Sequence, residues 1–432
     1  MHQPAPDFRP RVLHLAQPVD GGVARVVLDL VRAQLASGLR VTVGCPEGEL
    51  AFSARKLGAE VREWAAVRSP GPGLRGEVRR LGRLIAQARP ELVHAHSAKA
   101  GLAARLALRG RVPTVFQPHA WSFEAADGIT GLLARRWERL GARWADRVVC
   151  VSEAERERGL RAGVRAAYAV IPNGVDPVRF CPAPVEAARD ALAAELQAEG
   201  VDAANLGAEG VDAANLGAEG VGAESRSADG LRAEGLGGKS TRTAPLVVCV
   251  GRLCRQKGQD VLLRAWERVR TEVPDARLAL VGDGPDRAAL RAAAGPGVLF
   301  PGAVRDVRPW YRAADLVVLP SRWEGMALAP LEALACGRPV VVTDVDGARE
   351  SLPPASAGLC LVPPEDPGAL AAAVAGLLTD APLRAEFGES GRRHVLSTHD
   401  VRHTAERIAD LYRELLGARP PMPAERRESL LS

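Results

Sequence analysis

The sequence predicts an α/β protein made of two consecutive domains, each a doubly wound parallel sheet. Three observations support this prediction. Short apolar segments alternate with amphipathic helical segments along most of the 432 residues, which is the pattern of repeated βαβ units. The alternation begins at RVLHLA (11–16) and begins again at PLVVCVG (245–251). A stretch of small and acidic residues without apolar periodicity separates the two series.

The first series occupies residues 1–180. After its opening strand, GVARVVLDLVRAQLASG (22–38) has helical apolar spacing, and Gly38 ends the helix because glycine readily adopts the left-handed conformation found there. Helices connect the other strands, which we predict at residues 39–45, 91–96, 113–117, 147–152 and 167–172.

The second series occupies residues 242–400 and is followed by a C-terminal segment, 401–432. Its strands are continuous apolar runs, as expected for a parallel sheet covered by helices on both faces. We predict these strands at residues 245–251, 276–282, 298–302, 315–320 and 338–343.

Residues 186–240 connect the two series. They contain the ten-residue sequence AEGVDAANLG twice, at 198–207 and at 208–217. Two copies without bulky apolar residues cannot stack into a solenoid. The segment is acidic and poor in apolar side chains, so we predict a mostly disordered insertion between the domains.

Composition favours a cytoplasmic protein. Seven cysteines, an odd number without a C-x-x-C pair, argue against a disulfide framework or a zinc ribbon. The opening MHQPAPDFRP is polar and unlike a secretory signal. The longest apolar helical run, GALAAAVAGLL (368–378), is too short to span a bilayer.

Positive charge is concentrated in the first half of the chain. Residues 1–180 carry 28 Lys and Arg against 17 Asp and Glu, whereas the formal net charge of the whole chain is +5. No zinc-finger spacing, RNP motif or helix-turn-helix accompanies this charge, so no nucleic-acid partner is expected.

One segment of this basic half, GLLARRWERLGARWADR (131–147), predicts an amphipathic helix. Two interpretations stay open for its Leu/Trp face. In the first, the Leu/Trp face packs on the first sheet, as amphipathic helices in α/β domains usually do. In the second, the helix contacts an anionic membrane surface. The apolar face consists of Leu133, Trp137, Leu140 and Trp144, and the arginines off this stripe are Arg135, Arg136, Arg139 and Arg143.

The stretch SRWEGMALAPLEALACGRPVVVT (321–343) is the most informative. A helix is expected to begin near Ala327 and to stop at Gly337, and its first N–H groups would attract a phosphate. Glu324 and Glu332 lie on the order of 12 Å apart if the segment is helical. That spacing is too long for two carboxylates that share one glycosidic bond. It suits an extended ligand with a central phosphate and hydroxyl-bearing rings at both ends, such as a nucleotide sugar; two glutamates on a solvated helix face are the alternative.

This stretch resembles the E-x7-E signature of the family 4 glycosyltransferases, which have the GT-B fold of two Rossmann-like domains facing a central cleft. The resemblance implies that Glu324 contacts the hydroxyls of the donor sugar, that Glu332 contacts the ribose, and that the amides of Gly325 and Met326 approach the sugar and phosphate. Ala327 stands in this site where many members have Pro, and Asp346 stands where a Gly-Gly pair is usual. The matching positions are Glu324, Gly325, Met326, Glu332, Ala333, Ala335, Gly337, Pro339 and Val340.

Two further elements match the family. In GRLCRQKG (251–258), the resemblance implies that Arg252 and Lys257 neutralise the donor diphosphate, whose negative charge grows in the transition state. In FQPHAWSFE (116–124), His119 matches the family histidine that faces the donor sugar across the cleft. A structural histidine at a strand end is the alternative.

Glycines at strand ends complete the candidate site. Gly21 and Gly22 in QPVDGG (17–22) would admit a phosphate or acceptor near a helix N-terminus, although a tight turn explains them equally well. The resemblance also implies that Gly282, Gly302 and Val304 line the nucleotide, mostly through backbone atoms.

We expect no metal and no other cofactor. Asp344 and Asp346 imitate the D-x-D metal motif of the other large glycosyltransferase fold, but here they follow the E-x7-E helix and form a poor Mg²⁺ site. A nicotinamide enzyme is disfavoured because neither first strand is followed by G-x-G-x-x-G.

The resemblance therefore implies a retaining, metal-independent hexosyltransferase, with an acceptor domain at 1–180, a nucleotide-sugar domain at 242–400 and a C-terminal helix that crosses back onto the first domain. HAHSAKAG (94–101) and PHAWSFE are similar to members that build cell-surface polysaccharides. They favour a UDP-sugar over GDP-mannose and a glycan or polyprenyl-diphosphate-linked acceptor. A sugar-nucleotide hydrolase or phosphorylase and a catalytically silent binding module of this fold are the alternatives.

Overall fold

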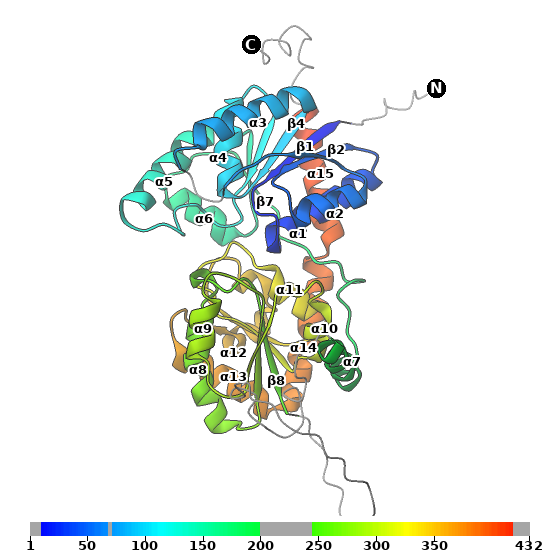
Figure 1. The fold of residues 1–432 in the computed structure, drawn as a ribbon, viewed down its shortest axis with the longest axis vertical. Helices are drawn as coiled ribbons and strands as arrows, with labels where there is room; N and C mark the ends of the chain where they lie inside the picture. Colours follow the sequence, from blue (N-terminus) through cyan, green and yellow to red (C-terminus); the bar gives the residue numbers. More distant parts are fainter. Residues whose placement is uncertain (1–9, 68–70, 199–243, 418–432) are drawn as a thin grey trace, which may run out of the picture.

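The computed structural model describes residues 10–67, 71–198 and 244–417, which form two α/β units, one above the other in Figure 1. The first unit has a seven-stranded parallel sheet in the order β3-β2-β1-β4-β5-β6-β7. Helices cover both faces of this sheet, which explains why its central strands are buried throughout. The strands are β1 (Arg11–Ala16), β2 (Arg40–Cys45), β3 (Glu60–Glu63), β4 (Leu92–His96), β5 (Thr114–Gln117), β6 (Arg147–Cys150) and β7 (Tyr168–Val170), and the helices are α1 (Gly21–Ala36), α2 (Glu49–Leu57), α3 (Leu74–Ala88), α4 (Ser97–Leu108), α5 (Gly128–Gly141) and α6 (Glu153–Arg161).

The second unit repeats this plan with a six-stranded parallel sheet in the order β10-β9-β8-β11-β12-β13. In both sheets the strand order reverses beside the first strand of the unit, between β1 and β4 and between β8 and β11. Doubly wound sheets bind ligands beyond the carboxyl ends of the strands at such a reversal. The strands are β8 (Leu246–Val250), β9 (Arg277–Val281), β10 (Val298–Gly302), β11 (Leu316–Leu319), β12 (Val340–Thr343) and β13 (Leu361–Val362), and the helices are α8 (Gln259–Glu272), α9 (Arg287–Ala293), α10 (Arg308–Ala313), α11 (Leu328–Ala335), α12 (Ala357–Cys360) and α13 (Pro367–Thr379).

The predicted fold class and the predicted strands are confirmed, and two edge strands were missed. β3 has the sequence EVRE, with a single apolar side chain, and β13 is two residues long. Neither has an apolar run to identify it, and β3 is only partly buried at the edge of its sheet.

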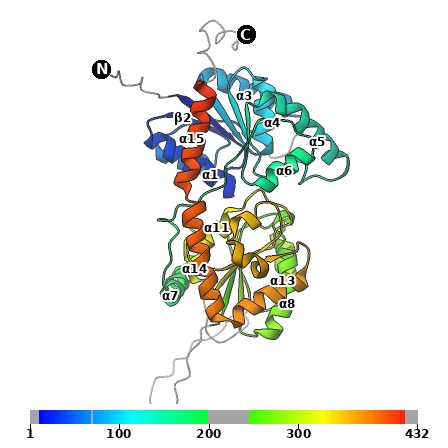
Figure 2. The same cartoon turned by 180° about the vertical axis from the view of Figure 1, so that it is seen from behind.

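Two C-terminal helices connect the units. α14 (Ala381–Thr398) packs on α11 of the second unit, and α15 (Val401–Gly417) packs on α1 of the first, as Figure 2 shows along one side of the molecule. The Tyr412 hydroxyl lies 2.6 Å from Nδ1 of His94 in the first sheet. A Cβ atom at Gly174 would lie 2.5 Å from Cα of Val401, so only glycine lets the two segments approach this closely. The predicted crossing of the final helix onto the first domain is therefore present.

The predicted disordered insertion is wrong at its beginning. Val185–Ala198 form a helix, α7, which packs on α10 of the second unit. Leu192 is buried there, and Arg189 binds the carboxylate of Asp315 at 2.5 Å. The acidic and small residues of this segment gave no sign of its buried face. A short amphipathic helix is stabilised mainly by packing against its neighbours, which composition does not reveal. The repeat at 198–217 lies almost wholly outside the described residues.

Of the two interpretations of the amphipathic segment, packing of its Leu/Trp face on the first unit is wrong for the leucines, whereas Trp137 and Trp144 are half-buried and Trp137 lies against Arg105. The residues that α5 buries are Glu138 and Gly141. Leu133 and Leu140 are 60% and 47% exposed. Glu138 turns inward because it pairs with the buried guanidinium of Arg105, at 2.8 Å. Within the described ranges, no helix has both the length and the apolar character needed to cross a membrane.

Candidate active site

A pocket of about 500 Å³ lies between the two units. Glu124 and Arg158 line it from the first unit, and Trp323, Glu324 and Asp346 line it from the second. Of the four predicted catalytic residues, Glu324 is the one that borders this pocket. The others lie around Glu324, at the carboxyl ends of β5 and β8.

Lys257 and Glu324 are brought together by two loops that follow β8 and β11. Lys257 Nζ lies 2.5 Å from Glu324 Oε1, and Ser321 Oγ donates to the same oxygen at 2.7 Å. The loops touch at Gly258, where a Cβ atom would lie 2.0 Å from the Pro320 carbonyl oxygen, so glycine is required. A cation and a carboxylate are thus fixed side by side where the two central strands end.

Arg252 belongs to the same loop as Lys257, but its side chain is exposed. Its carbonyl accepts a hydrogen bond from Gln259 at 3.0 Å, which holds the loop against α8. The structure therefore places one predicted cation against Glu324 and leaves the other beside it, open to solvent.

Glu332 lies on α11 and is buried. Its two oxygens accept hydrogen bonds from Arg25 at 2.8 Å and from the Tyr311 hydroxyl at 2.9 Å. Burial raises the pKa of this carboxyl, and Arg25 opposes that rise. Arg25 comes from α1 of the other unit, so sequence reasoning missed it; a single arginine on an amphipathic helix carries no signal of a partner 307 residues away.

Gly325 forms the contact between the units at the predicted catalytic histidine. A Cβ atom there would lie 3.0 Å from the carbonyl carbon of His119 and 3.1 Å from the amide nitrogen of Ala120. The Gly325 carbonyl accepts a hydrogen bond from Ser152 at 3.0 Å, and the next carbonyl, that of Met326, accepts one from Asn173 at 2.8 Å. The E-x7-E loop is thus held directly against the loop that carries His119.

The backbone at His119 is strained. His119 and Ala120 have φ of +56° and +121°, values that L residues rarely adopt. Glu155 holds this loop, because its carboxylate accepts the Ala120 and Val151 amides at 2.7 Å each. Burial raises the pKa of Glu155, and the two amide hydrogen bonds oppose that rise. Burial lowers the pKa of His119 to about 3, so His119 is a neutral imidazole at pH 7.

The predicted glycines lie at or just beyond the carboxyl ends of strands. Gly21 has φ of +69° at the start of α1, and a Cβ atom at Gly22 would be 3.8 Å from Leu328, the first residue of α11. Gly282 has φ of +145° and fits against the Gly251 carbonyl, where a Cβ atom would be 2.0 Å away. The remaining predicted positions are Gly302, with φ of +87°, the half-buried Val304 and Ala327, which caps α11.

Asp346, the departure from the family pattern, has a partner in the other unit. Arg158 of α6 donates to both oxygens of Asp346, at 2.5 and 2.7 Å. The backbone amides of Glu153 and Ala154, at the start of α6, donate to Glu350 at 2.9 and 3.0 Å. Asp344 instead binds Arg349 at 2.8 Å. The two carboxylates of the D-x-D segment thus point to different arginines.

Comparisons with known proteins agree with this architecture. Residues 20–179 match the family described as Glycosyltransferase Family 4, and residues 244–380 match the Glycosyl transferases group 1. Two relatives are from Mycolicibacterium smegmatis. A GDP-mannose-dependent alpha-(1-6)-phosphatidylinositol monomannoside mannosyltransferase is 32% identical over 62% of this chain and 62% of its own length. Alpha-maltose-1-phosphate synthase is 29% identical over 92% of this chain and 96% of its own length.

The solved structure of Anabaena HepE in complex with UDP and glucose has a TM-score of 0.73 and 21% identity, and the match covers 94% of this chain and all of that one. The alignments with the first curated relatives are shorter: the chain spans 62%, 51% and 48% of their lengths.

Two doubly wound parallel sheets with a pocket between them, together with these structural neighbours, define the GT-B class of proteins. Within that class, the sequence matches in both units are more specific than the fold. The chain belongs to the family 4 glycosyltransferases.

Proposed function

We propose that this protein transfers a hexose from a nucleotide-diphosphate sugar to an acceptor. The observation that carries the proposal is the arrangement at the ends of β8 and β11. Lys257 lies against Glu324, and the adjacent Gly325 lies against His119 of the other unit. A diphosphate held by Lys257 and Arg252 would place its sugar between Glu324 and His119, whose polar groups recognise hydroxyls. Gly282, Gly302 and Val304 would line the nucleotide, and Gly21 and Gly22 the acceptor side.

The ends of the proposed donor site are set by the two glutamates. Glu332 binds Arg25 and Tyr311. When a ribose binds, its hydroxyls would donate to Glu332 in place of Arg25. Tyr311 would continue to orient the Glu332 carboxylate. The replacement costs little free energy only if a ribose hydroxyl takes over the hydrogen bond that Arg25 gave, because a buried carboxylate without a partner is destabilising.

We assign a retaining mechanism without a metal. A double displacement would need a carboxylate close beneath the anomeric carbon. Glu324, the carboxylate that we propose contacts the sugar, is engaged by Lys257 and Ser321. In a same-face substitution the bond from the anomeric carbon to the diphosphate oxygen breaks while the acceptor oxygen bonds to that carbon. The departing oxygen takes the acceptor hydroxyl's proton, and Lys257 and Arg252 stabilise the growing charge.

The donor that we propose is a UDP-sugar, with GDP-mannose as the second candidate. The acceptor that we propose is a glycan or a polyprenyl-diphosphate-linked glycan in cell-surface polysaccharide synthesis. Support for both donors comes from the relatives: one is named as GDP-mannose-dependent, and a structural neighbour holds UDP and glucose.

The test is incubation with α-linked UDP-, GDP- and ADP-sugars in the presence of EDTA, with and without a polyprenyl-diphosphate acceptor. We expect nucleotide release that depends on the acceptor, and an α linkage in the product by NMR. A β linkage, or activity abolished by EDTA and restored by Mn²⁺, would overturn the mechanism. Release without acceptor would indicate a hydrolase, release that requires inorganic phosphate a phosphorylase, and no turnover a binding module.

We also propose that the protein works peripherally on the cytoplasmic face of a membrane, through α5. Its exposed apolar side chains include Ile129, Leu132, Leu133 and Leu140. Arginines beside this surface would attract anionic headgroups, which is the composition of helices that lie in the membrane interface.

Flotation with vesicles checks this proposal. We expect the protein to float with vesicles containing phosphatidylglycerol and to remain largely unbound with phosphatidylcholine alone. The double variant Leu133→Glu and Leu140→Glu should lose flotation, because charges would replace the inserted side chains. Val178→Glu, at a site that is 82% exposed elsewhere on the surface, is the matched control and should float normally. Equal recovery from both kinds of vesicle would remove the electrostatic part of the proposal.

A further inference from the structure

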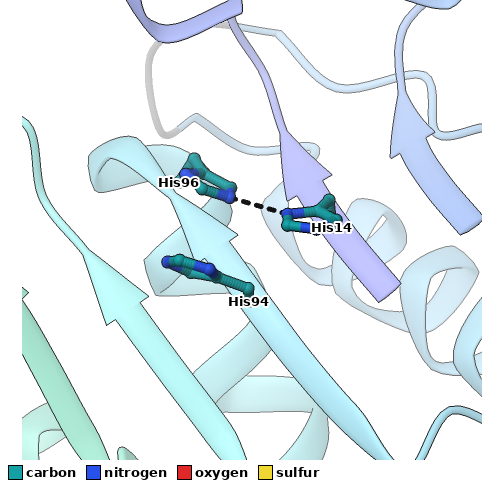
Figure 3. Close-up of side chains that lie close together, drawn as sticks. All are labelled: His14, His94 and His96. Carbon is teal, nitrogen blue, oxygen red and sulfur yellow. Dashed lines mark hydrogen bonds between the residues drawn. The ribbon is translucent and has the colours of Figure 1, made fainter. Parts of the chain in front are cut away.

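Four side chains of the first unit form an unbroken row of hydrogen bonds that ends at His119. Gln34 Oε1 on α1 lies 2.8 Å from His14 Nε2 on β1. His14 Nδ1 lies 3.0 Å from His96 Nε2 on β4, and His96 Nδ1 lies 3.2 Å from His119 Nε2. Figure 3 shows the central bond, between His14 and His96, with His94 beside them. His14 and His96 are completely buried, so water does not reach the middle of the row.

The row fixes the position of every proton in it, starting from the amide oxygen of Gln34. An amide oxygen only accepts hydrogen bonds, so His14 Nε2 carries a hydrogen. A neutral imidazole has one N–H, so His14 Nδ1 is an acceptor, and His96 Nε2 must donate to it. By the same reasoning His96 Nδ1 accepts, and His119 Nε2 donates. Nδ1 of His119 is therefore the nitrogen left with a free lone pair.

This reasoning requires that all three imidazoles are neutral, and their surroundings support that. Burial lowers the pKa of His14 to about 4 and that of His119 to about 3, and it lowers the pKa of His96 well below its ordinary value. The neighbouring histidines reinforce the effect on His96, because each positive charge would repel the next.

The geometry is that of a hydrogen-bonded row rather than a metal centre. His14, His94 and His96 bring three nitrogens within 4.8 Å of one another. However, the rings of His94 and His96 are stacked, with centroids 4.0 Å apart and planes inclined by 28°. Imidazole lone pairs lie in the ring plane, so stacked rings direct them side by side instead of toward one ion. The His94 Nδ1 atom is instead 2.6 Å from the Tyr412 hydroxyl.

We propose that Gln34, His14 and His96 are positioning residues that hold His119 in its Nε2–H tautomer, so that His119 Nδ1 accepts a hydrogen bond from a hydroxyl of the donor sugar. The inference rests on the proposed function for the identity of the ligand. The strained backbone at His119 and Ala120 agrees with this role, because strain of this kind persists only where the surroundings hold the residue in place. A sugar hydroxyl that donates to His119 then remains free to accept a hydrogen bond from elsewhere.

The first experiment reads the tautomer directly. The full chain, labelled with ¹⁵N in its eight histidines, is examined by long-range ¹H–¹⁵N NMR at pH 7, and the His119 signals are assigned with His119→Gln. We expect a protonated Nε2 and an unprotonated Nδ1. The opposite tautomer, or an equal mixture of the two, would overturn the proposal. This outcome does not depend on activity, so it is separate from failure of the proposed glycosyl transfer.

The second experiment links the row to turnover. Gln34→Met keeps the length of the side chain but removes the acceptor, so we expect His119 to become a mixture of tautomers and kcat/KM to fall by roughly threefold to tenfold, the value of one neutral hydrogen bond.

A matched control is Thr114→Val on β5, which removes a different buried hydrogen bond, from Thr114 Oγ1 to the Val112 carbonyl at 2.8 Å. It should lower the melting temperature about as much as Gln34→Met without changing the His119 tautomer or kcat/KM. Equal loss of activity in Thr114→Val and Gln34→Met, with an unchanged tautomer in both, would show that the row has only a structural role.

Discussion

Replacing Lys257 with alanine is expected to lower turnover of the nucleotide sugar by about 100-fold or more, because its charge would stabilise the departing diphosphate. Glu324→Ala should give a loss of similar size. Glu324 would contact the sugar, and its carboxylate also holds Lys257 Nζ at 2.5 Å. The measurement is kcat/KM for the donor that the wild-type protein uses, in variants whose circular dichroism and melting temperature show that they are folded.

Arg393→Ala is the control for loss of an ordinary ion pair. Arg393 pairs with Glu389 on the surface of α14, with both side chains more than half exposed. Such pairs contribute about 0–1 kcal/mol to stability, so the rate should be unchanged. If Lys257→Ala and Glu324→Ala both kept rates near those of the wild-type protein, Lys257 and Glu324 would not form the donor site.

The largest effect on stability is expected from Glu138→Ala in α5. Glu138 accepts hydrogen bonds from Arg105 and Ser122, at 2.8 Å each, in a site closed to solvent. Its removal would leave the Arg105 guanidinium buried without its counter-charge, which costs about 3–5 kcal/mol of unfolding free energy. Urea unfolding at pH 7, followed by circular dichroism, measures this change.

Glu157→Ala provides the comparison, since Glu157 forms an exposed pair with Arg161 at 3.6 Å on the neighbouring helix α6. We expect a change of less than about 0.5 kcal/mol for this variant. Equal and small effects from both substitutions would mean that Arg105 finds another partner, or water, when Glu138 is absent. In Glu138→Ala, the helix α5 that carries the proposed membrane surface would also lose its ion pair with Arg105.

Local patterns determined the architecture. Continuous apolar runs such as VVVT and LVVL predict covered parallel strands, because both faces of such a strand are buried whatever its neighbours are. The spacing of Glu324 and Glu332 around a helix start predicted a ligand site for a similar reason: both residues belong to one short segment, and its geometry follows from its own sequence. Gly337 likewise ended the predicted helix, and it adopts φ of +72° in the structure.

Composition was less informative wherever burial depends on a distant partner. The acidic sequence beginning at residue 186 predicted disorder, yet α7 is stabilised by a buried leucine and by Arg189 bound to Asp315. In α5 the spacing placed leucines and tryptophans on one face, but the choice of buried face was made by the Arg105–Glu138 pair. An ion pair between two helices cannot be inferred from either helix alone.

By itself, the sequence determined the two sheets, the loops at their carboxyl ends and the residues that those loops present, among them Lys257, Glu324 and His119. Only the tertiary structure decided what those residues contact. Arg25 meets Glu332 across 307 residues, Asp346 meets Arg158 across 188, and His14 meets His96 across 82. The physical reason is that strand and helix formation follow periodicities within a segment, whereas a hydrogen bond or ion pair depends on the relative placement of segments that packing alone fixes.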